Sequence, residues 1–582
     1  MAEGIPCWSG TDAAGGTRRL ALTICWALLL VSYGAAGNAA PANRAQEPAA
    51  WDAQIVTKPG VEDPVKVAIL ELLGDPQSVP LPVRQRREAL LAYYSNPSSR
   101  LLWQGLDNEL ADAFGQRVKN AEADGLQSHD NLYEQLLIMR RVNRFALSRE
   151  AHDHQAASRE LYWSAALLKY AGEIKRGRLL PTKIDTDLFW QEKSIDEGAA
   201  LQSIAALGQI DAFFDAWEPQ IPLYKALKRA LGEYRAIADN GGWPTVDVID
   251  VLKPGEASIV VPGLRQRLAV TDGVSKVPPQ ATQDETVYSD DLVEGVKRFQ
   301  RRHGLDDDGI LGKKTFFQLN IPVDARIRQI VLSMERVRWM PEDLGKHYVM
   351  VNIAGYELRR VKAGKVEEVM RVVVGQPFHQ TPVFSETMKY IEINPYWNVP
   401  HSIAVNEELP KLQQSPGARA EKGFEAVVGD KAVPLTAINW QKYSKSNFPV
   451  QLRQKPGPGN ALGQVKFMFP NRFNVYMHDT PARSLFSQSE RAFSHGCIRL
   501  ARPIDMAEQV LATSTTGWDR KRIDGVLAKG ERRVVSLATP IEVHITYSTA
   551  WRDEDGDVQF RPDIYRRDAK LYAALFGKAY PY

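Results

Sequence analysis

A short stretch of the chain carries residues that could do covalent chemistry. Cys497 ends the run Ser-His-Gly-Cys at 494–497, and another histidine, His478, precedes this run by a short loop. A thiol with an ordinary pKa near 8.5 is mostly protonated at neutral pH, so a cysteine nucleophile needs a neighbouring base. The residue types therefore predict nucleophilic catalysis by a Cys–His pair.

Two histidines compete for the role of that base. Residues 474–478 alternate as a strand does, so Tyr476 and His478 should project from the same face. His495 is closer to Cys497 in sequence, but residues two apart on a turn often point away from each other. We expect His478 to be the base, His495 to orient the site, and Tyr476 to offer its hydroxyl to substrate.

The neighbours of the nucleophile suggest how a substrate would be held. Gly496 lets a backbone approach closely, and the N–H groups of Gly496 and Cys497 could bind a developing oxyanion. Arg499 offers a planar cationic fork for a carboxylate. We expect Ser494 to contribute to substrate binding and Trp397 to form a wall of the pocket.

The N-terminal segment 1–40 resembles an export signal. Two arginines precede the mostly apolar run 20–31, and small residues follow it. The run is short for a membrane span, which needs about 20 apolar residues, although a retained anchor stays an alternative. Cleavage would remove Cys7 and Cys25 and leave Cys497 as the sole thiol, so an internal disulfide is excluded in the mature chain.

Composition limits the class of protein. The 582 residues are 44% hydrophobic and 25% charged, which fits several folded domains and excludes wholesale disorder or a polytopic membrane protein. The net charge is only +3, which gives no indication of nucleic-acid binding.

Apolar periodicity predicts a multidomain α+β chain. Residues 51–250 repeat apolar side chains at helical spacing and predict a helical scaffold. From 345 to 546 the pattern becomes alternating and β-branched, which predicts a mostly β catalytic domain. Within it, the proline-rich segment 402–464 is expected to be a lid. We expect the tail 547–582 to pack on the scaffold.

Residues 255–320 contain a Phe-Gln helix, a Gly-Leu turn, an Asp-Gly turn and a final helix that ends in Leu-Asn. This series of elements resembles the small three-helix peptidoglycan-binding domain. An unrelated helical bundle with tight glycine turns is the alternative.

The run at 494–497, with His478 upstream, closely resembles the signature of the YkuD-type L,D-transpeptidases. The segment 394–400, Asn-Pro-Tyr-Trp-Asn-Val-Pro, is similar to the part of that family that precedes the site. The order of domains resembles the large Gram-negative YcbB type over nearly the whole mature chain. The chain has Arg499 where many members have asparagine.

The resemblance implies a reaction without metal or organic cofactor. Cys497 would attack the third residue of a tetrapeptide stem, expel D-alanine and form a thioester, which the amine of a neighbouring stem would resolve into a 3,3-cross-link. Donor and acceptor stem peptides would be the substrates, carbapenems would acylate Cys497, and the location would be the periplasm of a Gram-negative bacterium. An uncleaved signal would associate the protein with the inner membrane, and other cell-wall enzymes are further partners to consider.

Two alternatives stay open. The same Cys–His pair could use water and trim stem peptides as an L,D-carboxypeptidase. The catalytic domain could instead be an inactive cell-wall binding scaffold, although the intact pair argues against this.

Overall fold

The structure, a computed structural model, describes residues 63–75, 77–105, 108–141, 148–276, 284–429 and 431–581. The expected export signal at 1–40 lies outside these residues. Within the described ranges, no helix is both long enough and apolar enough to span a membrane. Contacts divide the chain into two compact units, Met1–Arg178 with Lys193–Gln220, and Leu179–Glu192 with Ile221–Tyr582.

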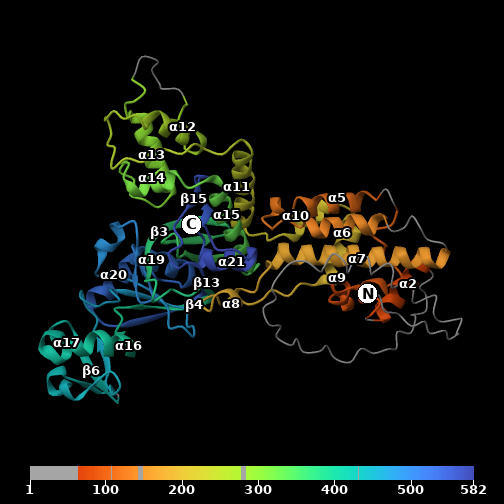
Figure 1. The fold of residues 1–582 in the computed structure, drawn as a ribbon. Coiled ribbons are helices and arrows are strands. Elements are labelled where there is room, and N and C mark those ends of the chain that lie inside the picture. Colours follow the sequence, from red (N-terminus) through yellow and green to blue (C-terminus); the bar gives the residue numbers. More distant parts are fainter. Residues whose placement is uncertain are drawn as a thin grey trace, which may run out of the picture. The chain divides into compact units, whose positions relative to one another are not determined.

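The first unit is helical and is built around the long helix α7 (Figure 1). Ser148 caps α7 by accepting a hydrogen bond from the Ala151 amide, and the middle of the helix is buried on nearly every side by its neighbours. The helices are α2 (Pro64–Gly74), α3 (Leu81–Arg84), α4 (Arg87–Tyr94), α5 (Glu109–Lys119), α6 (Asp130–Arg141), α7 (Arg149–Arg176), α9 (Glu197–Leu207) and α10 (Ile210–Trp217).

The second unit contains a large sheet whose strands follow the order β11-β3-β12-β10-β9-β4-β13-β1-β2, with a further β2–β3 pairing that closes it. The expected mostly β fold of this region is confirmed. The strands are β1 (His347–Asn352), β2 (Glu357–Lys362), β3 (Lys365–Gly375), β4 (Phe384–Ile393), β9 (Val465–Met468), β10 (Met477–His478), β11 (Ala492–Ser494), β12 (Ile498–Leu500) and β13 (Arg533–Thr546).

One helix of the expected scaffold region 51–250 packs with the second unit instead. Helix α11 (Pro222–Asp239) packs against α15 (Val323–Trp339), and its Tyr224, Leu227 and Leu231 join the core of the sheet. The helical unit therefore ends at Gln220, before the expected limit of 250. The other helices are α8 (Pro181–Ile184), α19 (Pro503–Ser514) and α20 (Arg520–Lys529).

Residues 255–320 fold around a small core of their own. Helices α12 (Val261–Thr271), α13 (Asp290–Arg302) and α14 (Lys313–Leu319) form it, as the sequence predicts. Arg302 is buried at its edge, pairs with Asp272 at 2.6 Å and donates to the carbonyl of Val558 at 3.1 Å. This group of bonds ties the three-helix domain to the rest of the second unit.

The expected lid is a folded subdomain rather than an irregular loop. Its strands lie in the order β5-β8-β6-β7 and cover a separate apolar core. Many short elements between prolines obscure any regular period in the sequence. They are β5 (Trp397–Asn398), α16 (His401–Ile403), the π-helix η4 (Ala404–Glu408), α17 (Leu409–Gln414), α18 (Pro416–Glu421), β6 (Phe424–Val428), β7 (Lys431–Val433) and β8 (Gln451–Gln454).

The tail, which we expected to pack on the scaffold, belongs to the second unit. Its elements β14 (Ala550–Arg552), β15 (Val558–Phe560) and α21 (Arg567–Phe576) belong to the second unit, where α21 contacts α15 and α8. Asp568 of α21 is fully buried and pairs with Arg336 of α15 at 2.5 Å. A buried carboxylate is stable only beside such a partner, so this pair fixes the position of the tail.

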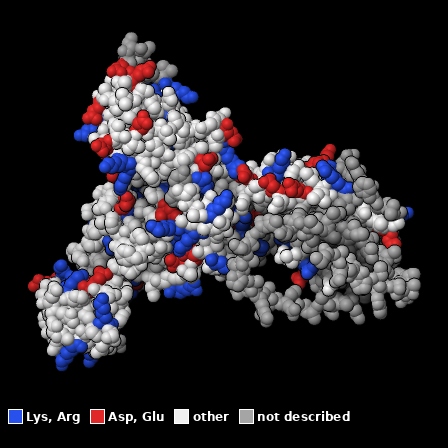
Figure 2. Space-filling view, viewed as in Figure 1, with Lys and Arg blue, Asp and Glu red and all other residues white. Residues whose placement is uncertain are grey.

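Charges of both signs are mixed over the surface. In the view of Figure 2, Lys and Arg side chains lie close to Asp and Glu on the lid subdomain and on the three-helix domain. This mixture agrees with the small net charge of the sequence.

Candidate active site

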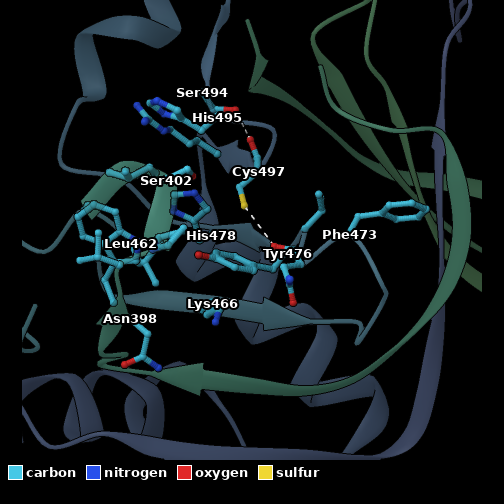
Figure 3. Close-up of a pocket in the computed structure, with 18 of the residues that line it drawn as sticks. Asn398, Ser402, Leu462, Lys466, Phe473, Tyr476, His478, Ser494, His495 and Cys497 are labelled. Carbon is cyan, nitrogen blue, oxygen red and sulfur yellow. Dashed lines mark hydrogen bonds between the residues drawn. The ribbon is translucent and has the colours of Figure 1, made fainter. Parts of the chain in front are cut away.

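Strand pairing brings the predicted chemical residues together. Strand β10 pairs in parallel with β12, so that Met477 faces Ile498 and His478 faces Arg499. Because side chains alternate along a strand, Tyr476 and His478 share one face with Cys497 and Arg499. On the other side of β10, His478 faces Lys466 of β9. Figure 3 shows the side chains of Lys466, Tyr476, His478 and Cys497 gathered at one site.

These residues line a cavity of about 670 Å³. The lid subdomain, including β5, forms one wall, and strands β9, β10 and β12 form the other. The cavity includes every predicted site residue except Gly496, whose place is in the backbone of the loop: Trp397, Tyr476, His478, Ser494, His495, Cys497 and Arg499.

The loop that carries the nucleophile is held by its own serine. The Ser494 hydroxyl donates to the carbonyl of Cys497 and accepts from the amide of Gly496 at 3.1 Å. Gly496 has a φ of 109°, a backbone conformation that favours glycine. Ser494 therefore shapes the turn, and the Gly496 amide is already bonded in this state, which differs from the oxyanion role expected for it. The amide of Cys497 makes no hydrogen bond to any described residue and is available for that role.

The thiol of Cys497 is half-buried and faces the cavity. It lies 3.9 Å from the carbonyl oxygen of Asn474, to which it donates a weak hydrogen bond. Burial raises the pKa of the thiol, and the opposing effects of Tyr476, Lys466 and Arg499 reduce this rise. The resting side chain of Cys497 is therefore a protonated thiol.

His478 is buried and neutral. Its side-chain Nδ1–H donates to the carbonyl of Asp479, which leaves Nε2 as an acceptor for a proton. Burial, followed by the nearby charge of Arg499, lowers the pKa of His478 to about 3. A neutral imidazole is the form that a general base requires, and the backbone carbonyl of Leu462 also lies against this ring.

His495 makes different contacts. Its Nε2 lies 2.7 Å from a carboxylate oxygen of Glu407, which belongs to the π-helix η4 of the lid. Its ring lies beside that of His379, with 4.9 Å between the ring centroids. The structure thus places His495 between the loop that carries Cys497 and the lid subdomain.

Lys466, Tyr476 and Arg499 set the charge and polarity of the cavity around the thiol. The Lys466 ammonium lies 4.0 Å from the centroid of the Tyr476 ring, and the Tyr476 ring is 5.6 Å from that of His478. The buried Nε of Arg499 has no hydrogen-bond partner among the described residues. An unpartnered buried guanidinium nitrogen is costly, which favours an anionic ligand at this place.

Tyr565 of the tail is connected by hydrogen bonds to the loop that carries Cys497. Tyr565 donates its hydroxyl hydrogen to the carbonyl of Gly375 and accepts from the amide of Thr381 at 3.3 Å. The Thr381 hydroxyl in turn donates to the carbonyl of Gly496 at 2.9 Å. Two consecutive contacts therefore connect Tyr565 to the residue next to the nucleophile.

Sequence reasoning missed several of these residues. Lys466 was detectable, since it occupies the polar position between Val465 and Phe467 in a predicted strand. Glu407 had no comparable signal, and Tyr565 belongs to a tail segment that resembles the family but gave no indication of a contact with the site, because each reaches the site through long-range packing.

Family comparisons identify the domains. Residues 346–542 match the L,D-transpeptidase catalytic domain, residues 266–319 match a model described as "Putative peptidoglycan binding domain", and residues 88–231 match a scaffold domain. The resemblance found in the sequence is thereby confirmed at the level of domains.

A curated relative carries a description that agrees with the match to the catalytic domain. A Haemophilus influenzae protein described as "Putative L,D-transpeptidase" is 30% identical over 248 residues, which cover 42% of this chain and 49% of the relative. The chain thus spans about half the length of this curated relative.

Two solved structures are also similar. An L,D-transpeptidase from Xylanimonas cellulosilytica is 13% identical, with 51% of this chain and 98% of that chain covered and a TM-score of 0.17. The Ldtfm–avibactam carbamoyl enzyme is 12% identical, with 55% and 99% covered and a TM-score of 0.16.

Proposed function

We propose that this chain, which contains an L,D-transpeptidase catalytic domain, forms 3,3-cross-links between peptidoglycan stem peptides through a thioester on Cys497. The observation that carries the proposal is the shared face of Cys497 and neutral His478 at one cavity. The domain similar to peptidoglycan-binding modules supports the same substrate class.

The chemistry divides into two acyl transfers. The Cys497 sulfur attacks the carbonyl carbon of the third stem residue, and the bond to D-alanine breaks. The thiol proton passes through His478 Nε2 to the departing amine. The side-chain amine of an acceptor stem then attacks the thioester, forms the new amide and restores the thiol. A thioester route needs no organic cofactor.

Other side chains have roles in this scheme. Arg499 is suited to a substrate carboxylate, because its buried Nε lacks a partner among the described residues. Tyr476 offers its hydroxyl to the substrate, Trp397 forms a pocket wall, and the Cys497 amide binds the oxyanion. Carbapenems would acylate the same sulfur. An exported protein in the periplasm of a Gram-negative cell would meet this substrate.

Incubation with purified tetrapeptide muropeptides tests the function. Mass spectrometry is expected to show dimers that have lost one D-alanine. Shortened monomers alone would indicate an L,D-carboxypeptidase, and unchanged muropeptides would indicate a binding scaffold. Either of these results would contradict the proposed cross-linking.

The lid is proposed to exclude water from the thioester and so to favour the amine acceptor. The ion pair between Glu407 of the lid and His495 supports this, because it joins the lid to the nucleophile loop. Both side chains are more than one-third exposed, and such pairs contribute up to about 1 kcal/mol.

Glu407→Gln is therefore expected to raise the ratio of hydrolysed tetrapeptide to cross-linked dimer by about two- to fivefold. The product ratio is measured by mass spectrometry at equal extents of acylation. Glu421→Gln, at an exposed position in the same lid, is the matched control and should leave the ratio unchanged. Equal ratios in the wild type and the Glu407 variant would mean that this pair does not gate the reaction.

A further inference from the structure

A row of charged side chains crosses the sheet at the level of the base. Arg499 on β12 pairs with His478 on β10, His478 pairs with Lys466 on β9, and Lys466 pairs with Glu392 on β4. Lys466, His478 and Arg499 all line the cavity that contains Cys497. The nucleophile is thus flanked by cations on two strands, with the imidazole between them.

The carboxylates near the cavity, Glu392 and Glu407, already bind other side chains. Glu392 accepts from Arg532 at 3.0 Å, and Glu407 pairs with His495 at 2.7 Å. Together with Tyr476, these are the titratable and charged groups that the strands and the lid place around the sulfur. Within the described residues, the buried Nε of Arg499 has no hydrogen-bond partner, and Lys466 contacts the Tyr476 ring.

The imidazole is a poor source of positive charge here. Burial, Arg499 and Lys466 keep its pKa at about 3, so an imidazolium beside these cations is unfavourable. Lys466 and Arg499 act on the Cys497 thiol in the opposite direction to burial. The charge that a thiolate requires must therefore come from groups other than His478.

We propose that Lys466 and Arg499 together stabilise the thiolate of Cys497, and that Lys466 is a positioning residue that acts on the sulfur across the Tyr476 ring. The inference rests on the proposed function only in taking Cys497 as the nucleophile. It predicts a measurable property of the thiol that needs no stem peptide.

Alkylation of the full-length protein by iodoacetamide measures that property. The thiol proton leaves to water, the sulfur electron pair forms the new C–S bond, and iodide departs. Lys466→Met is expected to shift the rate profile to higher pH and to slow alkylation at pH 7.5 by about tenfold, which corresponds to about one pKa unit. Lys466→Arg should retain most of the wild-type rate.

A comparison of alkylation by iodoacetate and by iodoacetamide distinguishes an electrostatic effect on the thiol from a change in packing. Cations near the sulfur favour this anionic reagent, so Lys466→Met should lower the rate ratio of iodoacetate to iodoacetamide, whereas loosened packing would change both rates alike. Arg499→Met should act in the same direction and keeps the test informative if Lys466→Met fails to fold.

Lys389→Met is the matched control, since Lys389 is an exposed lysine of the adjacent strand β4. Unchanged profiles and ratios in folded Lys466→Met, or an equal shift in the control, would overturn the inference. Failure of muropeptide cross-linking with a normal Lys466 effect would instead refute the proposed function alone.

Discussion

Replacing Cys497 with alanine is expected to abolish both cross-linking and acylation by a carbapenem. The change removes the sulfur that forms the thioester, and no other free cysteine occurs among the described residues. Loss of a covalent nucleophile lowers turnover on the order of 10⁴-fold or more in comparable enzymes. Intact-mass spectrometry of the carbapenem adduct and muropeptide analysis measure the two losses.

The variant should keep its fold, because the Cys497 side chain is small, half-buried and bonded only weakly, to the Asn474 carbonyl and to Tyr476. Ser484→Ala, at an exposed serine on the preceding loop, is a matched small-side-chain control and should behave as wild type. Dimers formed by a folded Cys497→Ala protein would refute the thioester mechanism.

His478→Ala should slow carbapenem acylation by about 10²- to 10⁴-fold, the usual contribution of a positioned general base. Stopped-flow acylation measures the rate, and circular dichroism checks the fold. His495→Ala is the matched comparison and should cost less, because His495 pairs with Glu407 of the lid. A larger loss in His495→Ala would reverse the assignment of the base.

The pH dependence provides a second check on His478. Because its pKa is lowered to about 3, the imidazole is already neutral throughout the range from pH 5 to 9. The pKa of Cys497 is raised, so the thiolate fraction grows as pH increases. The wild-type acylation rate should therefore rise through the alkaline range without an inflection near pH 6.5. Such an inflection would show that His478 titrates normally.

Local sequence patterns located the strand that carries the site but made it too long, since β10 covers only Met477–His478 of the expected 474–478. Alternation around Tyr476 and His478 indicated their common face, and the structure confirms it through the inward, buried positions of Val475 and Met477. A two-residue period is a strong signal when one face of a strand is buried.

Other features could not be predicted from local patterns. Ser494 was expected to bind substrate, but its hydroxyl bonds within the loop, and only the turn geometry shows this. The tail was assigned to the scaffold because no local pattern reveals that Asp568 pairs with Arg336, more than 200 residues away in the chain. Long-range ion pairs leave no periodic trace in a sequence.

The support that the tail gives to the nucleophile loop affects the order in which the site is completed during synthesis. Tyr565 follows Cys497 in the chain, and it holds Gly375 and Thr381 against the loop. A ribosome adds residues from the N-terminus, so the sheet and the thiol emerge before the side chain that fixes them. A partly synthesised chain therefore contains Cys497 without its final support, and the full set of contacts behind the loop requires Tyr565.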